Sequence, residues 1–293
     1  MVAAVGLRRA DPGREPDPVG TCPYCVGCDT PRVPDTTVRA VATDPLFLLH
    51  EVADAVAAAF AASTDRGPAG GHPGQYSFDV VSDAAALEVL RRAGYGVLSE
   101  ESGMERGTRD EVVVIDPIDG STNASRGIPW FATSLCIVDA DGPAVALVAD
   151  QASGRRWWAV RGSGAQVDGR ALRVSGCTDV TQAIVGLNGI PPVHLGQRQS
   201  RMLGAAALDI SLVAGGSLDA YVDCAEQAHG VWDYLGATLI CREAGGTVID
   251  AFGRPLEVLD HAARRTPVAA ASAELAAVLA ARRRGYADPP PGA

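Results

Sequence analysis

An apolar run that ends in acidic residues is the feature that most constrains how this chain can fold. Residues 111–115 read Glu-Val-Val-Val-Ile, which is typical of a buried strand, and residues 116–123 continue as Asp-Pro-Ile-Asp-Gly-Ser-Thr-Asn. We therefore expect the carboxylates of Asp116 and Asp119 to lie where a strand ends. Gly120, directly after them, lets the backbone approach a ligand closely.

A second predicted strand ends in the same way. Residues 96–101 read Gly-Val-Leu-Ser-Glu-Glu, so Glu100 and Glu101 add two carboxylates at a strand end. Carboxylate oxygens that have no neighbouring His or Cys select hard cations, Mg²⁺ before Zn²⁺. Four such groups repel one another when ionised unless cations lie between them. The two strand ends together predict a magnesium site.

The complete absence of lysine excludes several chemistries. All 25 basic residues of the 293-residue chain are arginine. A P-loop nucleotide-binding site and a Schiff-base enzyme both need a lysine amine. Aspartyl-phosphate chemistry of the haloacid dehalogenase type is excluded as well, because two residues rather than one separate Asp116 from Asp119 and the usual lysine is missing. The formal net charge of −10 disfavours nucleic-acid binding.

Hydrophobic periodicity predicts alternating helices and strands. Asp44 and Pro45 form a helix start, with a capping carboxylate and a proline at the first helical position. Short strands and helices alternate along the second half, so we expect a layered α/β fold rather than a bundle or a sandwich. Helices are predicted at 45–62, 82–94, 205–214, 232–244 and 274–284, with a short one opening at Ser121, and strands at 96–101, 111–115, 134–138, 144–149, 156–160, 183–186, 219–222 and 247–249.

Composition divides the chain into four segments. We expect a disordered N-terminal extension over residues 1–41, an N-terminal half over 42–179, a C-terminal half over 180–285 and a disordered tail over 286–293. Cys22, Cys25 and Cys28 in the extension fit a zinc or iron–sulfur site, or a cysteine-rich tail without a metal. No apolar run approaches the roughly 20 residues that span a bilayer, which predicts a cytoplasmic protein without a membrane partner.

The motifs taken together resemble the inositol monophosphatase family of metal-dependent, lithium-sensitive phosphatases. That family has an Asp, then Glu-Glu, then Asp-Pro-Ile/Leu-Asp-Gly-Ser/Thr, and finally Trp-Asp, eleven residues and Gly-Gly. The matching positions here are Asp83, Glu100-Glu101, residues 116–121, Trp232-Asp233 and Gly245-Gly246. The resemblance covers residues 42–285. It implies an α+β sugar-phosphatase fold with layers in the order αβαβα, two sheets sandwiched by helices, and a homodimer.

The resemblance also implies a site with two or three Mg²⁺ ions and assigns its residues. Glu100 and Ser121 would activate the attacking water, and the N–H groups of Gly120 and Ser121 would hold the phosphate. Asp83 and Glu101 would have supporting roles. The implied metal ligands are Glu100, Asp116 and the carbonyl of Ile118 for the first ion, with Asp116, Asp119 and Asp233 for the second.

The implied reaction is hydrolysis of a small polyol or sugar phosphate, such as an inositol monophosphate, as the phosphorylated partner. On the substrate side, the resemblance points to Ala206 and to either Asp223 or Glu226. The family often has a lysine in the loop before Asp83, and residues 64–75 cannot supply one. Three alternatives use the same motifs with another substrate: a 3′-phosphoadenosine nucleotide, fructose bisphosphate or histidinol phosphate. A non-catalytic metal-binding module is a further alternative.

Overall fold

A computed structural model describes residues 44–71, 74–225 and 229–285. The predicted extension over residues 1–41, with its three cysteines, and the predicted tail over 286–293 lie outside the described residues. The helices of the described part are α1 (Pro45–Ala62), α2 (Ser77–Ala93), α3 (Ser121–Arg126), α4 (Ala206–Ala214), α5 (Val231–Glu243) and α6 (Ala273–Arg284).

Thirteen described strands form two sheets. The large sheet has the order β2-β1-β3-β4-β5-β6-β7-β8, and the small sheet has the order β10-β9-β11-β13-β12. The strands are β1 (Gly96–Ser99), β2 (Gly103–Glu105), β3 (Val112–Asp119), β4 (Ala132–Asp139), β5 (Gly142–Asp150), β6 (Arg156–Val160), β7 (Ala165–Val167), β8 (Arg170–Ala171), β9 (Ile184–Asn188), β10 (Gln199–Arg201), β11 (Ala220–Asp223), β12 (Thr247–Asp250) and β13 (Pro267–Ala270).

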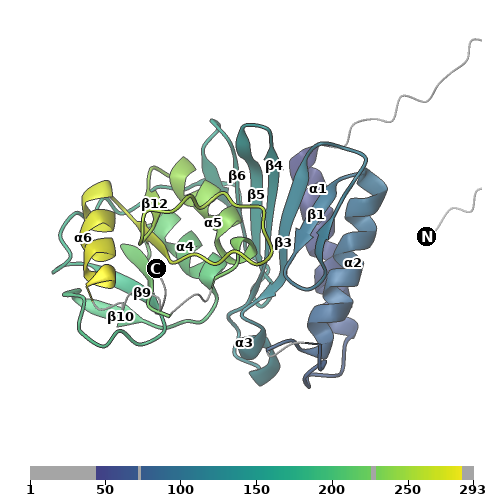
Figure 1. Cartoon of the computed structure of the whole chain (residues 1–293), viewed down its shortest axis with the longest axis horizontal. Helices are drawn as coiled ribbons and strands as arrows, with labels where there is room; N and C mark the ends of the chain where they lie inside the picture. Colours follow the sequence, from purple (N-terminus) through teal and green to yellow (C-terminus); the bar gives the residue numbers. More distant parts are fainter. Residues whose placement is uncertain (1–43, 72–73, 226–228, 286–293) are drawn as a thin grey trace, which may run out of the picture. The chain divides into compact units, whose positions relative to one another are not determined.

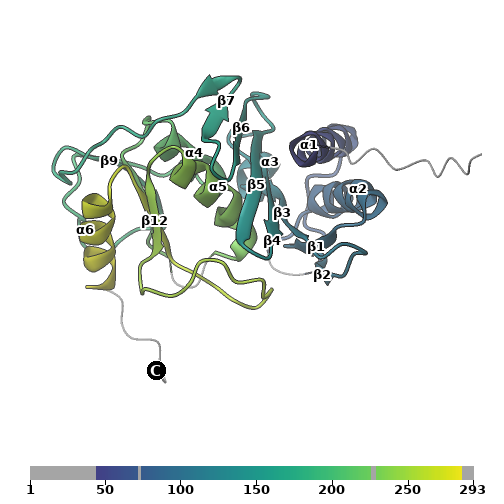
Figure 2. The same cartoon turned by 90° about the horizontal axis from the view of Figure 1, so that it is seen from above.

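Helices and sheets alternate in five layers. Figure 2 shows α1 and α2 on one face of the large sheet, α4 and α5 between the two sheets, and α6 on the far face of the small sheet. Three buried apolar clusters fill the spaces between these layers. The αβαβα layering implied by the sequence resemblance is therefore confirmed. The predicted division into halves at residue 179 falls in the connection between β8 and β9 and stays a prediction.

Helix α1 begins and ends at the predicted residues. The Asp44 side chain accepts a hydrogen bond from the Leu46 N–H at 3.0 Å, and Pro45 occupies the first helical position. By length and composition α1 is apolar enough to cross a membrane, so the expectation that no segment qualifies is too strict. This is weak support for a membrane span. Apolar residues of the helix, including Leu49 and Val52, are fully buried in the core.

Helix α2 begins five residues before the predicted start. Its N-cap is Tyr76, whose N–H donates to Asp79 Oδ2 at 2.9 Å. This bond is the backbone half of a capping box, in which an acidic side chain at the third helical position satisfies an N–H at the helix start. The helix ends as predicted at Gly94, which has a left-handed φ of 80°. The early start places Asp79 on the helix, one turn before Asp83.

Strand β3 continues through the acidic motif instead of ending before it. Its pairing with β4 shifts by one residue between Asp116 and Asp119, which marks a bulge. Pro117 lies in the bulge, where a residue without an N–H is tolerated, and Thr133 Oγ1 donates to its carbonyl at 2.8 Å. The bulge bends the strand at the point where the two carboxylates project.

The predicted strands are present, with boundaries that differ by a few residues, and the sequence analysis missed five short ones. The missed strands are β2, β7, β8, β10 and β13. Four of them have no more than three residues, too few for a period-two pattern to appear. The turn at 161–165 connects β6 to β7 in an antiparallel hairpin, as predicted.

Candidate active site

One cavity gathers the acidic residues of four elements. It has a volume of about 630 Å³ and lies at the ends of β1 and β3, beside the first turns of α2, α3 and α5. Six carboxylates line it, together with the start of α3 and two basic side chains of the β12–β13 connection. The charged and polar lining residues are Asp79, Glu100, Glu101, Asp116, Asp119, Ser121, Thr122, Asp233, His261 and Arg264.

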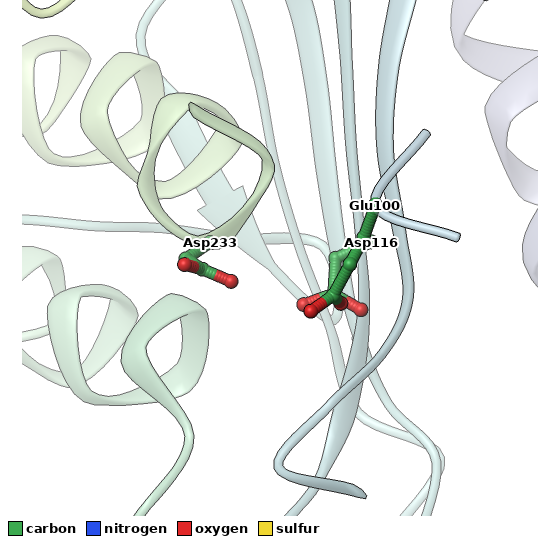
Figure 3. A group of neighbouring side chains, drawn as sticks. All are labelled: Glu100, Asp116 and Asp233. Carbon is green, nitrogen blue, oxygen red and sulfur yellow. The ribbon is translucent and has the colours of Figure 1, made fainter. Parts of the chain in front are cut away.

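Three of these carboxylates are arranged to share a cation. Oxygen atoms of Glu100, Asp116 and Asp233 lie within 4.8 Å of one another. Figure 3 shows the Glu100 and Asp116 carboxylates side by side, with Asp233 facing them from helix α5. The parallel pairing of β1 with β3 places Glu100 beside Asp116, and the packing of α5 against the large sheet adds Asp233. In the described part of the chain this is the group of His, Cys, Asp and Glu whose geometry suits a metal ion.

The electrostatics of the cluster favour a bound cation. Asp116 is buried, and its Oδ1 has no hydrogen-bond partner among the described residues. Burial, followed by the charge of Glu100, raises the pKa of Asp116 well above its ordinary value. Burial and the charge of Asp233 do the same to the pKa of Glu100. Like charges this close ionise together only when a cation compensates them, so the cluster is chemically suited to hold a divalent ion.

Asp119 lies in the cavity but is held away from the three-carboxylate cluster. Its Oδ1 accepts from the Ala206 N–H at 3.2 Å, and its Oδ2 accepts from the Ala207 N–H at 2.7 Å. These are two of the free N–H groups at the start of α4, where a negative charge is favourable. These bonds link β3 to α4, and the sequence-based role of Asp119 as a second-ion ligand stays a prediction.

The Ser121 hydroxyl is paired with a carboxylate that the sequence analysis missed. Ser121 Oγ lies 2.9 Å from Asp79 Oδ1 and 2.7 Å from the carbonyl oxygen of Ile118. The expected role of Glu100 and Ser121 in activating water stays a prediction, and Asp79 is an additional carboxylate beside Ser121. Asp83, which was matched to the first acidic position of the family pattern, instead accepts a bond from Ser99 Oγ at 2.6 Å and does not line the cavity. An acidic residue in the first turn after an aromatic N-cap is the signal that could have identified Asp79.

Asp233 is fixed by a buried histidine behind it. Its Oδ2 accepts from the Gly230 N–H at 2.8 Å and lies 3.1 Å from His229 Nδ1, so Oδ1 carries neither bond. His229 Nε2 lies 2.8 Å from the Tyr221 hydroxyl. Burial acts to lower the pKa of His229, but the hydrogen bond and the charge of Asp233 outweigh it and raise that pKa to about 9. The sequence analysis did not identify this histidine.

The two predicted substrate-side residues that the structure describes, Ala206 and Asp223, do not line the cavity. Ala206 is buried and uses its N–H to bind Asp119. Asp223 is completely buried at the end of β11, where Asn188 Nδ2 donates to its Oδ1 at 3.0 Å. The alternative, Glu226, lies outside the described residues. Ala206 and Asp223 thus lie outside the cavity lining, and their substrate-side roles stay predictions.

Glu101 lines the cavity, and the Gln75 side-chain amide donates to its carboxylate; its supporting role stays a prediction. Gly120 and Ser121 also line the cavity. Gly120 has a left-handed φ of 90°, and a Cβ there would lie 3.0 Å from the Trp130 carbonyl oxygen, so this position requires glycine. Gly120 therefore allows the turn into α3 to pack closely against the backbone at Trp130 and Gly204.

Comparisons with known proteins agree with this geometry. The model of the inositol monophosphatase family matches residues 78–286. A fructose-1,6-bisphosphatase/inositol-1-monophosphatase from Methanothermobacter thermautotrophicus is 32% identical over 221 residues, covering 67% of this chain and 79% of the relative. A protein named Nus factor SuhB from Pasteurella multocida is 33% identical over 195 residues, covering 60% of this chain and 72% of the relative. The structure of an inositol monophosphatase from Anabaena superposes with a TM-score of 0.68 at 23% identity, covering 82% of this chain and 95% of the Anabaena chain.

Proposed function

This chain belongs to the inositol monophosphatase family, and we propose that it is a cytoplasmic, Mg²⁺-dependent phosphomonoesterase of a small polyol or sugar phosphate. The observation that carries the proposal is one cavity in which the Glu100–Asp116–Asp233 cluster lies beside a hydroxyl–carboxylate pair. A cation site alone does not need that pair. The relative named as a fructose-1,6-bisphosphatase and inositol-1-monophosphatase supports phosphate-ester hydrolysis.

The donor set fits magnesium. Glu100, Asp116 and Asp233 offer carboxylate oxygens within 4.8 Å of one another, and no His or Cys ligand is among them. Asp119 and the Ile118 carbonyl line the same cavity and remain proposed as further ligands of a second ion. When bound, Mg²⁺ supplies positive charge for the phosphate oxygens and lowers the pKa of coordinated water.

The residues of the chain supply proton transfer and orientation. We propose that Ser121 Oγ orients the attacking water, accepts a proton from it and passes its own proton to Asp79, whose carboxylate is within hydrogen-bond distance. The N–H groups of Gly120 and Ser121 bind phosphate oxygens at the start of α3. Tyr76 holds Asp79 through its backbone N–H, so the base is fixed before a substrate arrives. Hydrolysis by water needs no covalent phosphoenzyme.

Two further expectations stay proposals. A homodimer is proposed from the family alone. The expectation that no nucleic acid is a partner rests on the formal net charge of −10, and the relative named as a Nus factor gives it no support. That name keeps a non-catalytic role as the second candidate function.

The proposal is tested by measuring phosphate release from a panel of phosphate esters. The panel contains inositol 1-phosphate, fructose 1,6-bisphosphate, 3′-phosphoadenosine 5′-phosphate and histidinol phosphate, each with Mg²⁺, with EDTA, and with Mg²⁺ plus Li⁺. We expect Mg²⁺-dependent release from at least one compound and inhibition by Li⁺. Asp116→Asn should lower kcat/KM by at least about 100-fold, because a shared metal ligand loses its charge.

The matched control is Asp110→Asn, which removes one carboxylate from the exposed loop before β3. It should retain wild-type activity. The phosphatase proposal is wrong if the wild-type protein releases no phosphate from any compound while it binds Mg²⁺ in calorimetry. That result would support the non-catalytic alternative.

A further inference from the structure

The connection between β12 and β13 contributes the two basic side chains of the acidic cavity. His261 and Arg264 belong to residues 251–266, which leave the small sheet, pass the active site and return. Figure 1 and Figure 2 both show this connection extending from β12 toward the large sheet. The role that we proposed for the cavity, hydrolysis of a phosphate ester, uses neither side chain.

His261 anchors the connection to the active site through a hydrogen bond and a ring contact. Its Nε2 lies 2.9 Å from the carbonyl oxygen of Glu100, which is a proposed metal ligand. Its ring lies 4.7 Å from the ring of Trp232, the residue before Asp233. A turn follows, in which the Asp260 side chain accepts from the Ala262 N–H at 2.9 Å. The backbone at 260–264 is therefore placed by contacts with both sides of the metal cluster.

Arg264 is oriented without an acidic partner. Its Nη1 donates to the carbonyl oxygens of His261 at 2.8 Å and Ala263 at 3.0 Å, and its guanidinium lies 5.2 Å from the centre of the Trp232 ring. Among the described residues no ion pair involves Arg264, although six carboxylates line the same cavity. The nearby Arg254, in contrast, is paired with Asp250 at 2.7 Å.

We infer that Arg264 forms a second oxyanion subsite in this cavity, so that the substrate carries a second anionic group besides the phosphate that is removed. The inference rests on the proposed phosphatase function. An arginine that is held on carbonyl oxygens and an aromatic face keeps Nε and Nη2 available, and a guanidinium fork matches the oxygens of a phosphate or a carboxylate. Because the chain has no lysine, arginine must supply any such cation.

Two pairs of substrates separate the two sources of a second anion. Fructose 1,6-bisphosphate and fructose 1-phosphate differ by one remote phosphate. In the other pair, 3-phosphoglycerate and glycerol 3-phosphate differ by a carboxylate in place of a hydroxymethyl group. We expect the wild-type enzyme to have a higher kcat/KM for the doubly anionic member of at least one pair, and that pair identifies the second group.

The variant Arg264→Gln should lower kcat/KM for the preferred doubly anionic substrate by about 10- to 100-fold, mainly through KM, because one charged hydrogen-bonding contact is lost. Its singly anionic partner should change by no more than about twofold. Arg264→Lys should restore part of the loss. The control is Arg106→Gln, which removes an exposed arginine after β2. It should leave kcat/KM unchanged for all four substrates of the two pairs.

Binding without turnover gives a second readout. In an Asp79→Asn background with Mg²⁺, we expect Arg264→Gln to raise the Kd of the preferred doubly anionic compound by about 10-fold or more and to leave that of its singly anionic partner unchanged. Equal losses for both members of a pair, in kcat/KM and in Kd, would overturn the subsite and leave the phosphatase function standing. Arg264-dependent binding without phosphate release from any compound would refute the phosphatase function and retain the subsite.

Discussion

At the scale of single residues, two acidic side chains one helical turn apart have different roles. Asp79 and Asp83 lie on the same face of α2, since they are four residues apart. Asp79 reaches Ser121 in the cavity, whereas Asp83 reaches the buried Ser99 at the end of β1. The sequence pattern matched Asp83 because the predicted helix began at residue 82. The true start at Ser77 adds an earlier turn, and it is this turn that faces the cavity.

Replacing each of these aspartates by asparagine separates their roles. Asp79→Asn should lower kcat by about 100- to 10,000-fold, because the proposed proton acceptor is lost while the side-chain shape is kept. Asp83→Asn should retain kcat within about threefold, since it touches no lining residue of the reaction. Steady-state kinetics on the best substrate of the panel checks both. A large kcat loss in Asp83→Asn with a normal Asp79→Asn enzyme would contradict the assignment.

At the scale of elements, helix α5 positions the metal cluster by its close contact with the large sheet. Ser134 Oγ on β4 donates to the Trp232 carbonyl at 2.9 Å, one residue before Asp233. One turn later Gly236 lies so close to β4 that a Cβ there would be 2.9 Å from the Leu135 carbonyl oxygen. The absence of a side chain at Gly236 lets the helix approach the sheet that carries Asp116.

Adding one methyl group at this contact should therefore push the helix away from the sheet. Gly236→Ala should lower the free energy of unfolding by roughly 1–3 kcal/mol, because the clash with the backbone exceeds the gain in helix propensity. Urea unfolding measures the change. Gly285→Ala is the matched control, because its φ is −65° and a Cβ there meets no atom closer than 3.4 Å. Equal effects of the two substitutions would contradict the packing argument.

At the scale of the whole molecule, buried carboxylates make stability depend on pH. Asp209 on α4 is buried, and Trp130 Nε1 of the segment between α3 and β4 donates to its Oδ1 at 2.8 Å. Burial raises the pKa of Asp209 to about 7, against the opposing effect of that hydrogen bond. Between the unfolded pKa of 3.8 and the folded value of about 7, the folded state thus binds more protons than the unfolded state.

The unfolding free energy of the wild-type protein should fall as the pH rises through this window, because the slope is negative wherever the folded state holds the extra proton. The Asp209→Asn variant lacks this titration. Relative to wild type, it should gain on the order of 4 kcal/mol between pH 4 and pH 8, and the difference should be constant above about pH 8. Urea unfolding of both proteins across this range, with EDTA present, checks the prediction. Parallel curves would show that Asp209 is not a buried acid with a raised pKa.

The sequence by itself indicated the family, the layered class and the acidic residues of the candidate site. Apolar strands that end in carboxylates predict a hard-cation site wherever they fold, since ligand preference belongs to the residue type. Helix α1 was predicted to the residue, because its cap, its first proline and its apolar spacing are all local signals. Motif order along the chain was enough to indicate the family.

The tertiary structure alone decided which side chains meet. Three contacts join residues that are distant in the sequence. Asp79 and Ser121 are 42 positions apart, Asp119 and Ala207 at the start of α4 are 88 apart, and Arg264 and Trp232 are 32 apart. Asp223 was expected near the substrate and lies in the core instead, because the end of β11 is paired inside the small sheet. Side-chain contacts of this kind depend on strand register and helix packing, and no local periodicity encodes either of them.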